Sequence, residues 1–225
     1  MSVRDAWREA FPAVAARVVL AYVVDCWRQV SAKQSPHFAW AMNEPDITKR
    51  FRKHLANGSD NAGLTGHWSA EAVDMDLQSD LSPKNTHRTD IMYFSDRVQP
   101  RLSLTFEFKK LKDNSDSRKK YYGNAGMCRF VEAIYAKDDP FDIMVAIIED
   151  DSQRACVKHL KSALRSDDAR ALLKYVPDPA TGLHVREPSC EMPKLAEFDT
   201  QHHRDSGPFD TFMFCHLVLG FPDSP

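Results

Sequence analysis

The chain has 225 residues, of which 43% are hydrophobic and 28% are charged, a composition typical of a globular protein that buries most of its apolar surface. Its 30 basic residues nearly balance 32 acidic ones, and the net charge of −2 excludes strong long-range attraction to polyanions. Any nucleic-acid binding must therefore come from local basic patches. The length predicts a single domain over residues 1–225.

Cysteine usage and the N-terminal sequence favour a cytoplasmic protein. The five cysteines are widely spaced and form no CxxC pair, which argues against a disulfide framework and a zinc ribbon. The first ten residues mix acids with bases and lack the cleavage site of a secretory signal. The longest apolar stretch, Ala13 to Val24, contains Arg17 and falls short of the roughly 18 to 20 residues that cross a bilayer. We therefore expect a buried helix there and no membrane association.

Hydrophobic periodicity predicts two helices in the first quarter of the chain. The first is expected over about residues 13–30, with an apolar face that includes Val14 and Val18. The second is expected over about residues 44–56, with a proline in its first turn and an i, i+4, i+8 apolar stripe. Residues 57–85 are rich in Gly, Ser, Asn and Asp and predict a loop with at most a short strand.

From about residue 89 the spacing of apolar residues changes from the helical period to a period of two, as in a β-strand. Alternating runs over about residues 89–94 and 101–112, separated by a turn at 97–100, predict a β-hairpin. A helix is expected over about residues 118–137. The strand that follows, at 141–148, has a near-continuous apolar sequence that suits burial on both faces.

The remaining residues predict two more helices and a last strand. The helices are expected over about 153–164 and 168–175, before a turn around Gly182. A strand over about 211–221 is expected to close the sheet or cap its edge. This order of elements predicts an α/β fold, with a central mixed β-sheet flanked by helices.

The run RLSLTFEFK, residues 101–109, carries the most informative pattern in the chain. Strand alternation places four apolar side chains on one face and directs Glu107 and Lys109 to the other, at a solvent-reachable end of the sheet. Asp90 lies on the preceding strand, and a hairpin in register brings it to the same face as Glu107. The alternative interpretation is an exposed charged strand face without a chemical role.

Two converging carboxylates repel each other, and a hard divalent cation relieves that repulsion by binding oxygen atoms from both. We expect this cation to be Mg²⁺, for which Mn²⁺ can substitute. Lys109 would orient or deprotonate an attacking water and neutralise charge that develops on a phosphate. These are the requirements of phosphodiester hydrolysis.

The arrangement resembles the PD-(D/E)xK, or restriction-endonuclease-like, nuclease superfamily, in which an Asp on one strand is followed by Glu-x-Lys on the next, then a helix and a strand. Here the pattern reads Asp90, then Glu107, Phe108 and Lys109, then a helix beginning SRKKYYGNAG and the strand FDIMVAII, with Thr89 in place of the Pro. The resemblance implies a restriction-endonuclease-like core over 41–150. An N-terminal helical extension (1–40) and a C-terminal α/β extension (151–225) would flank this core.

The resemblance also implies the roles of individual residues. Asp90, Glu107 and the main-chain carbonyl of Phe108 would bind the metal ion, and Asp90, Glu107 and Lys109 would be catalytic, with Glu44 in NEPDITKRF as an accessory catalytic residue. The implied activity is that of a metal-dependent endonuclease acting on DNA. A setting in prokaryotic antiviral defence or in DNA repair follows by analogy with similar nucleases.

Basic residues near the predicted site favour nucleic-acid binding through phosphate contacts. The candidates are Lys110, Lys112, Arg118, Lys119 and Lys120 beside the site, and Arg52 and Lys53 on the second helix. A solvated charged surface is the alternative interpretation of these residues.

The C-terminal sequence leaves further alternatives open. His202, His203, Cys215 and His216 are residue types that bind zinc, but their spacing matches no known zinc motif, and a buried Cys215 with surface histidines is expected instead. The C-terminal extension could form an interface with a protein partner or a second copy of the chain, so that the nuclease acts in a larger complex. The chief alternative to an enzyme is a catalytically inactive module of the same fold, which binds nucleic acid or serves as a structural subunit.

Overall fold

The computed structural model describes residues 11–77, 83–99, 101–149 and 152–222, and for residues 71–77 and 83–89 it describes the backbone only. The first ten residues, on which the secretory-signal prediction depends, lie outside the described residues. Within those residues, no helix combines the length and apolar character that crossing a bilayer requires.

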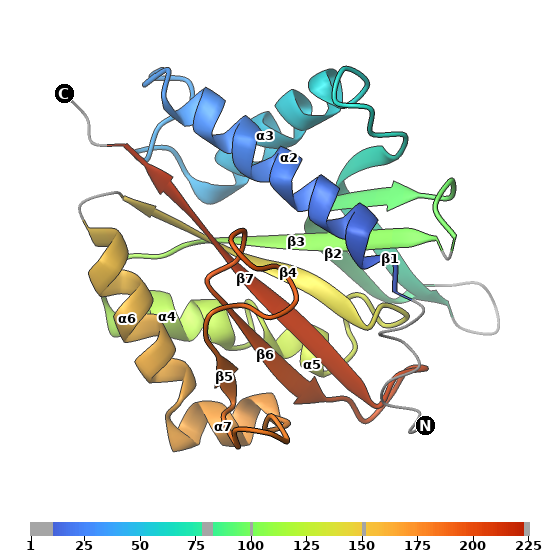
Figure 1. Ribbon diagram of the computed structural model, residues 1–225, viewed down its shortest axis with the longest axis vertical. Coiled ribbons are helices and arrows are strands. Elements are labelled where there is room, and N and C mark those ends of the chain that lie inside the picture. The colour runs from blue at the N-terminus through green and yellow to red at the C-terminus, as the bar shows by residue number, and fades with distance from the viewer. Residues whose placement is uncertain (1–10, 78–82, 100, 150–151, 223–225) are drawn as a thin grey trace.

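A mixed seven-stranded β-sheet is the centre of the fold (Figure 1), with the strand order β1-β2-β3-β4-β7-β6-β5. The strands are β1 (His67–Leu77), β2 (Pro83–Ser95), β3 (Leu102–Lys110), β4 (Phe141–Glu149), β5 (Val185–Arg186), β6 (Phe198–His203) and β7 (Thr211–Phe221). The central strands β3, β4 and β7 are parallel, and the outer pairs are antiparallel. The predicted β2–β3 hairpin and the mixed sheet are confirmed.

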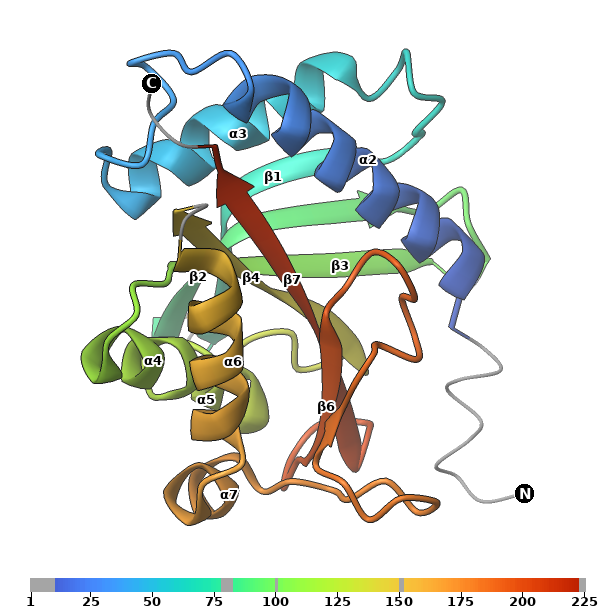
Figure 2. The ribbon, with the colours of Figure 1, turned by 60° about the vertical axis from the view of Figure 1, so that its left-hand side comes forward.

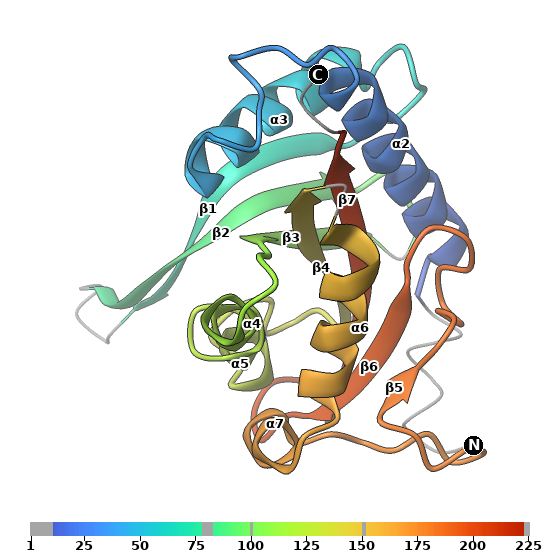
Figure 3. The same cartoon turned by 90° about the vertical axis from the view of Figure 1, so that its left-hand side faces the viewer.

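Helices cover both faces of this sheet (Figures 2 and 3). One face carries α2 (Ala13–Ser31) and α3 (Glu44–Gly58), and the other carries α4 (Ser115–Tyr122), α5 (Cys128–Val131), α6 (Gln153–Leu164) and α7 (Asp167–Leu173). The two layers form separate apolar cores. Alternate residues of β4, such as Val145 and Ala146, enter opposite cores, so this strand is buried on both faces as predicted.

Helix α2 confirms the first predicted helix but not its apolar face. Leu20, Val23 and Trp27 are buried, whereas Val14 and Val18 are 74% and 50% exposed. The helix is therefore buried along one side only, and the assignment of Val14 and Val18 to the buried face is wrong.

Helix α3 forms as predicted, for identifiable local reasons. The Asn43 side chain caps its N-terminus by accepting a hydrogen bond of 2.9 Å from the N–H of Asp46. Ile47, Phe51 and Leu55 form the buried stripe. The capped end of α3 lies beside the carboxyl end of β3, which positions the first turn of the helix at the candidate site.

Two local predictions are wrong. The predicted loop over 57–85 contains β1 and the start of β2, because the two segments pair over most of their length. The helix predicted over 118–137 is two short helices, since the chain turns between α4 and α5. At Gly126 a Cβ atom would lie 1.9 Å from the carbonyl oxygen of Tyr121, so this close turn requires glycine.

The position of the last strand also differs from the prediction. β7 lies in the interior of the sheet, parallel to β4 on one side and antiparallel to β6 on the other. Trp27 in α2 donates a hydrogen bond of 2.8 Å to the carbonyl of Gly220 in β7. The sheet therefore continues across the boundary predicted at residue 150, and both ends of the chain contribute to one core.

Candidate active site

The β2–β3 hairpin brings two predicted acids together. The antiparallel register pairs Ile91 with Phe106, which places Asp90 and Glu107 opposite each other at the next position. Asp90 is held by a hydrogen bond from the N–H of Phe108 to its Oδ2, at 2.9 Å. Burial raises the pKa of Asp90, and the positive charge of Lys109 opposes that rise.

Glu107 is much less exposed than its sequence pattern predicts. It is only 3% accessible, because helices cover the face of the sheet to which it points. Its Oε1 accepts a hydrogen bond from Lys109, and its buried Oε2 has no hydrogen-bond partner among the described residues. Burial and the nearby charge of Asp90 raise the pKa of Glu107 to about 7, although Lys109 acts in the opposite direction. The prediction of a solvent-reachable carboxylate is wrong for this residue.

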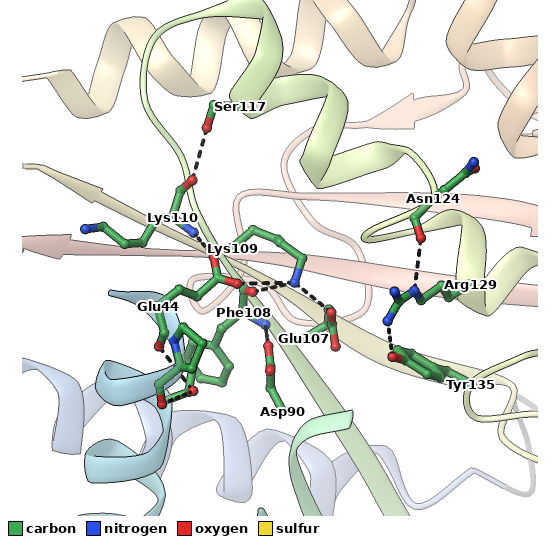
Figure 4. A network of polar contacts seen from close by, with 12 residues as sticks. Glu44, Asp90, Glu107, Phe108, Lys109, Lys110, Ser117, Asn124, Arg129 and Tyr135 are labelled. Atoms are coloured by element: carbon green, nitrogen blue, oxygen red, sulfur yellow. Dashed lines mark hydrogen bonds and ion pairs between the residues drawn. The ribbon is translucent and has the colours of Figure 1, made fainter. Parts of the chain in front are cut away.

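The Lys109 ammonium lies at the centre of the site (Figure 4). Its Nζ is 2.7 Å from Oε1 of Glu107, 3.0 Å from the carbonyl oxygen of Phe108 and 3.4 Å from Oε1 of Glu44. Burial alone would lower the pKa of Lys109, but the charges of Glu107, Glu44 and Asp90 together raise it above its ordinary value. The side chain therefore remains a cation among oxygen atoms.

Glu44 reaches the site from α3, whereas Asp90, Glu107 and Lys109 come from the β2–β3 hairpin. While its Oε1 faces Lys109, its Oε2 accepts a hydrogen bond of 2.6 Å from the N–H of Lys110. This bond satisfies a main-chain donor at the end of β3. The structure thus brings the four predicted catalytic residues into one cluster.

A groove of about 450 Å³ opens beside this cluster. Its lining residues are Glu44, Lys109, Lys110, Lys112, Asn114, Asp116, Ser117, Lys120 and Ala125. Four lysines against two acids make the groove locally basic on a chain with net charge −2. Such a groove suits a polyanion.

Lys110 lines the groove, but its ammonium has partners within the protein. Its Nζ donates hydrogen bonds to the carbonyl oxygens of Trp40 and of Met42, the latter at 2.8 Å. It also lies 4.1 Å from the centre of the Trp40 ring. Lys110 therefore anchors the segment before α3 to the end of β3.

The other predicted nucleic-acid contacts are distributed unevenly. Lys112 and Lys120 are exposed and line the groove, whereas Lys119 is exposed outside it. Arg118 pairs with Asp113 at 2.9 Å. Arg52 and Lys53 lie about two turns beyond Glu44 along α3 and are not among the groove-lining residues.

Arg129 and Tyr135 lie near the site and have no part in the sequence prediction. Burial raises the pKa of Asp90, and the positive charge of Arg129 opposes that rise. Burial, and after it the charge of Glu107, raise the pKa of Tyr135. Arg129 donates hydrogen bonds to Tyr135 and to the carbonyl of Asn124 (Figure 4). One signal could have identified it: an arginine within the apolar run MCRFV.

The oxygen atoms of the site have the chemistry of a magnesium site. Hard divalent cations prefer carboxylate and carbonyl oxygens, which Asp90, Glu107 and Phe108 supply, and the partnerless Oε2 of Glu107 is an acceptor suited to a cation. Even so, across the part of the chain that the structure describes, no group of three His, Cys, Asp or Glu side chains is arranged to hold a metal ion. The expected ligand set has only two such side chains, Asp90 and Glu107, and the Lys109 ammonium contacts the Glu107 carboxylate and the Phe108 carbonyl.

The C-terminal histidines belong to a buried hydrogen-bonded chain. His202 Nδ1 lies 2.7 Å from the carbonyl of Leu173, which only accepts, so this nitrogen is a donor. Its Nε2 then accepts from Thr200 Oγ1, which in turn accepts from His216 Nε2, and His216 Nδ1 accepts from the hydroxyl of Tyr121. Burial lowers the pKa of His202 to about 3 and that of His216 well below its usual value, so both rings are neutral.

All four ring nitrogens in this chain are engaged, which leaves neither imidazole free to bind zinc. Cys215 is buried, as predicted, and its thiol lies 3.0 Å from Oδ1 of Asp199. His203 is exposed as predicted, but the expectation of a surface location is wrong for His202 and His216, which are fully buried.

Comparisons with protein-family models, with curated proteins and with solved structures find no match. The feature that points to a function is therefore the cluster of Asp90, Glu107 and Lys109, of which Lys109 also lines the basic groove.

Proposed function

We propose that this chain is a metal-dependent endonuclease with a restriction-endonuclease-like core, which hydrolyses phosphodiester bonds of DNA. The observation that supports this proposal best is the meeting of Asp90, Glu107, the Phe108 carbonyl and Lys109 beside a lysine-lined groove. Two adjacent carboxylates repel a phosphate, so a surface that only binds nucleic acid gains nothing from them. They are useful where a cation binds.

Asp90, Glu107 and the carbonyl of Phe108 would hold Mg²⁺, or Mn²⁺ in its place. The metal ion would supply Lewis-acid polarisation of the phosphate and lower the pKa of a water molecule. Lys109 would donate hydrogen bonds to a phosphate oxygen as negative charge grows there. Glu44 acts as a positioning residue, since it contacts both Lys109 and the N–H of Lys110.

The groove would receive the nucleic-acid backbone. Lys112 and Lys120 are exposed along it and carry the charges that phosphate contacts require. Asn114 and Ser117 line the same groove, although both side chains also stabilise the start of α4. The basic surface and the acidic cluster thus lie next to each other, as cleavage of a bound backbone demands.

We place this activity in the cytoplasm, and by analogy with similar nucleases in antiviral defence or DNA repair. All five cysteines are free thiols, which fits a reducing compartment. A protein partner or second copy would bind through the C-terminal region.

A cleavage assay tests the proposal. The purified chain is incubated with supercoiled plasmid, single-stranded DNA and RNA in Mg²⁺, Mn²⁺ or EDTA. Glu107→Gln and Lys109→Met are compared with matched controls at exposed positions outside the site, Glu197→Gln and Lys158→Met. We expect metal-dependent cleavage of DNA, and we expect its rate to fall at least about 100-fold in both site variants. Loss of a residue that only hydrogen-bonds to a metal ligand already lowers metal affinity or activity by about 10- to 100-fold.

Three outcomes would contradict the proposal or change it. Equal behaviour of the wild type and Lys109→Met under every metal condition would favour the inactive binding module. Cleavage of RNA but not DNA would make RNA the substrate. Cleavage only with an added partner protein would mean that the active form is a complex.

A further inference from the structure

The position among the expected metal ligands is held by a side chain of the protein itself. Lys109 Nζ contacts the Glu107 carboxylate and the Phe108 carbonyl, which are two of the three expected ligands, at 2.7 and 3.0 Å. Its side chain is only 13% exposed, and Glu44 lies on its far side at 3.4 Å. The ammonium therefore contacts oxygen atoms of two expected ligands, Oε1 of Glu107 and the carbonyl oxygen of Phe108.

We infer that Lys109 is the resident cation of this site and that it must leave its present position before a divalent metal ion binds. The inference rests on the proposed function, because it concerns the same metal site. A metal ion on Glu107 and Phe108 would share oxygen atoms with Lys109 Nζ, and two cations so close together repel each other. Lys109 thus determines how tightly the site binds its metal.

The groove provides a place for the displaced ammonium. Lys109 is itself one of the groove-lining residues, and its flexible four-carbon stem allows the charge to swing away from Glu107. A phosphate in the groove would then replace the carboxylates as the partner of the ammonium. Because each ligand favours the same displaced state, metal and nucleic acid bind with positive cooperativity.

Calorimetric titration with Mn²⁺ alone, without nucleic acid, tests the inference. The wild type, Lys109→Met and Lys120→Met are compared. Lys120→Met removes the same charge from the same groove, but among the contacts of the described residues the ammonium bound to the site carboxylates is that of Lys109, not Lys120. We expect Lys109→Met to bind Mn²⁺ at least about tenfold more tightly than the wild type, and Lys120→Met to stay within about twofold of it.

A second variant guards against misfolding. Lys109→Gln retains a hydrogen-bonding amide but loses the charge, so it should also bind Mn²⁺ more tightly than the wild type. It takes the place of Lys109→Met in the titration if Lys109→Met does not fold. Equal or weaker Mn²⁺ binding by the folded Lys109 variants would overturn the inference, as would an equal gain in Lys120→Met.

Failure of the inference can be told apart from failure of the proposed function. If the wild type cleaves DNA with Mg²⁺ but the Lys109 variants gain no Mn²⁺ affinity, only the inference fails. If tighter Mn²⁺ binding appears without any cleavage by the wild type, the inference holds and the nuclease proposal fails.

Discussion

The Asp90 carboxylate accepts a hydrogen bond from the main-chain N–H of Phe108, with Oδ2 2.9 Å from the nitrogen. The bond joins β2 to β3 just beyond Ile91 and Phe106, the last residues that pair in the ladder. An acidic side chain therefore replaces a strand contact and is held beside Glu107. Asp90 serves the fold through one oxygen and the proposed chemistry through its charge.

Substitutions at Asp90 should separate these two contributions. Asp90→Asn keeps an oxygen that can accept from Phe108, so we expect stability close to that of the wild type but loss of Mn²⁺ binding. Asp90→Ala leaves the N–H without a partner and should cost about 1 to 2 kcal/mol of unfolding free energy. Chemical denaturation and Mn²⁺ titration measure the two effects. Equal stability of both variants would contradict the structural role of the hydrogen bond.

The raised pKa of Glu107 predicts a pH-dependent stability. The folded protein holds the Glu107 proton up to pH of about 7, whereas the unfolded chain releases it near the ordinary value of 4.5. The folded state therefore binds more protons between these values. The stability that the raised pKa of Glu107 adds to the folded state is complete below pH 4.5 and is lost as pH rises through about 7.

Glu107→Gln has no proton to release and provides the comparison. We expect the unfolding free energy of the wild type, relative to Glu107→Gln, to fall by about 3 kcal/mol between pH 4.5 and 7.5. Urea denaturation of both proteins across this range measures the difference. Parallel profiles would show that burial does not perturb Glu107.

Lys110 and Lys112 should differ in their effect on stability although both line the groove. Lys110 donates to the carbonyls of Trp40 and Met42, so Lys110→Gln should lower the unfolding free energy by about 1 to 3 kcal/mol. Lys112 is exposed, and Lys112→Gln should change it by less than about 0.5 kcal/mol. Equal losses, measured by urea denaturation, would contradict the anchoring role of Lys110.

The groove lysines should determine the salt dependence of nucleic-acid binding. Each of Lys112→Gln and Lys120→Gln should lower the slope of log K against log salt by about 0.9 for duplex DNA, since each removes one phosphate contact. Lys119→Gln provides the matched control, because Lys119 is exposed but lies outside the groove lining. Fluorescence anisotropy with Ca²⁺ or EDTA measures the slopes, and an equal loss in Lys119→Gln would rule out the groove as the binding path.

Sequence periodicity predicted the elements whose stability is local. The apolar stripe of α3, the alternation in β3 and the apolar run of β4 each identify a buried face without knowledge of partners. Asp90 and Glu107 were predicted to meet because consecutive strands of a hairpin share one register. The four clustered residues Glu44, Asp90, Glu107 and Lys109 follow from these elements.

Strand positions and burial that depend on residues far apart in the sequence could not be predicted from the sequence. The interior position of β7 is set by its pairing with β4 and β6, for which no local pattern exists. β6 has a polar sequence, yet Thr200 and His202 are buried because partners from other elements satisfy them. Likewise, spacing predicted that Lys109 lies near Glu107, but not that its ammonium would be enclosed by Glu107, Phe108 and Glu44.

A crystal of the chain soaked in Mn²⁺ and recorded at the manganese absorption edge tests the central proposal most directly. We expect one anomalous peak about 2.0 to 2.3 Å from oxygen atoms of Asp90, Glu107 and Phe108, with Lys109 turned toward the groove. A crystal without a peak there, in which Lys109 still contacts Glu107 at saturating Mn²⁺, would contradict it.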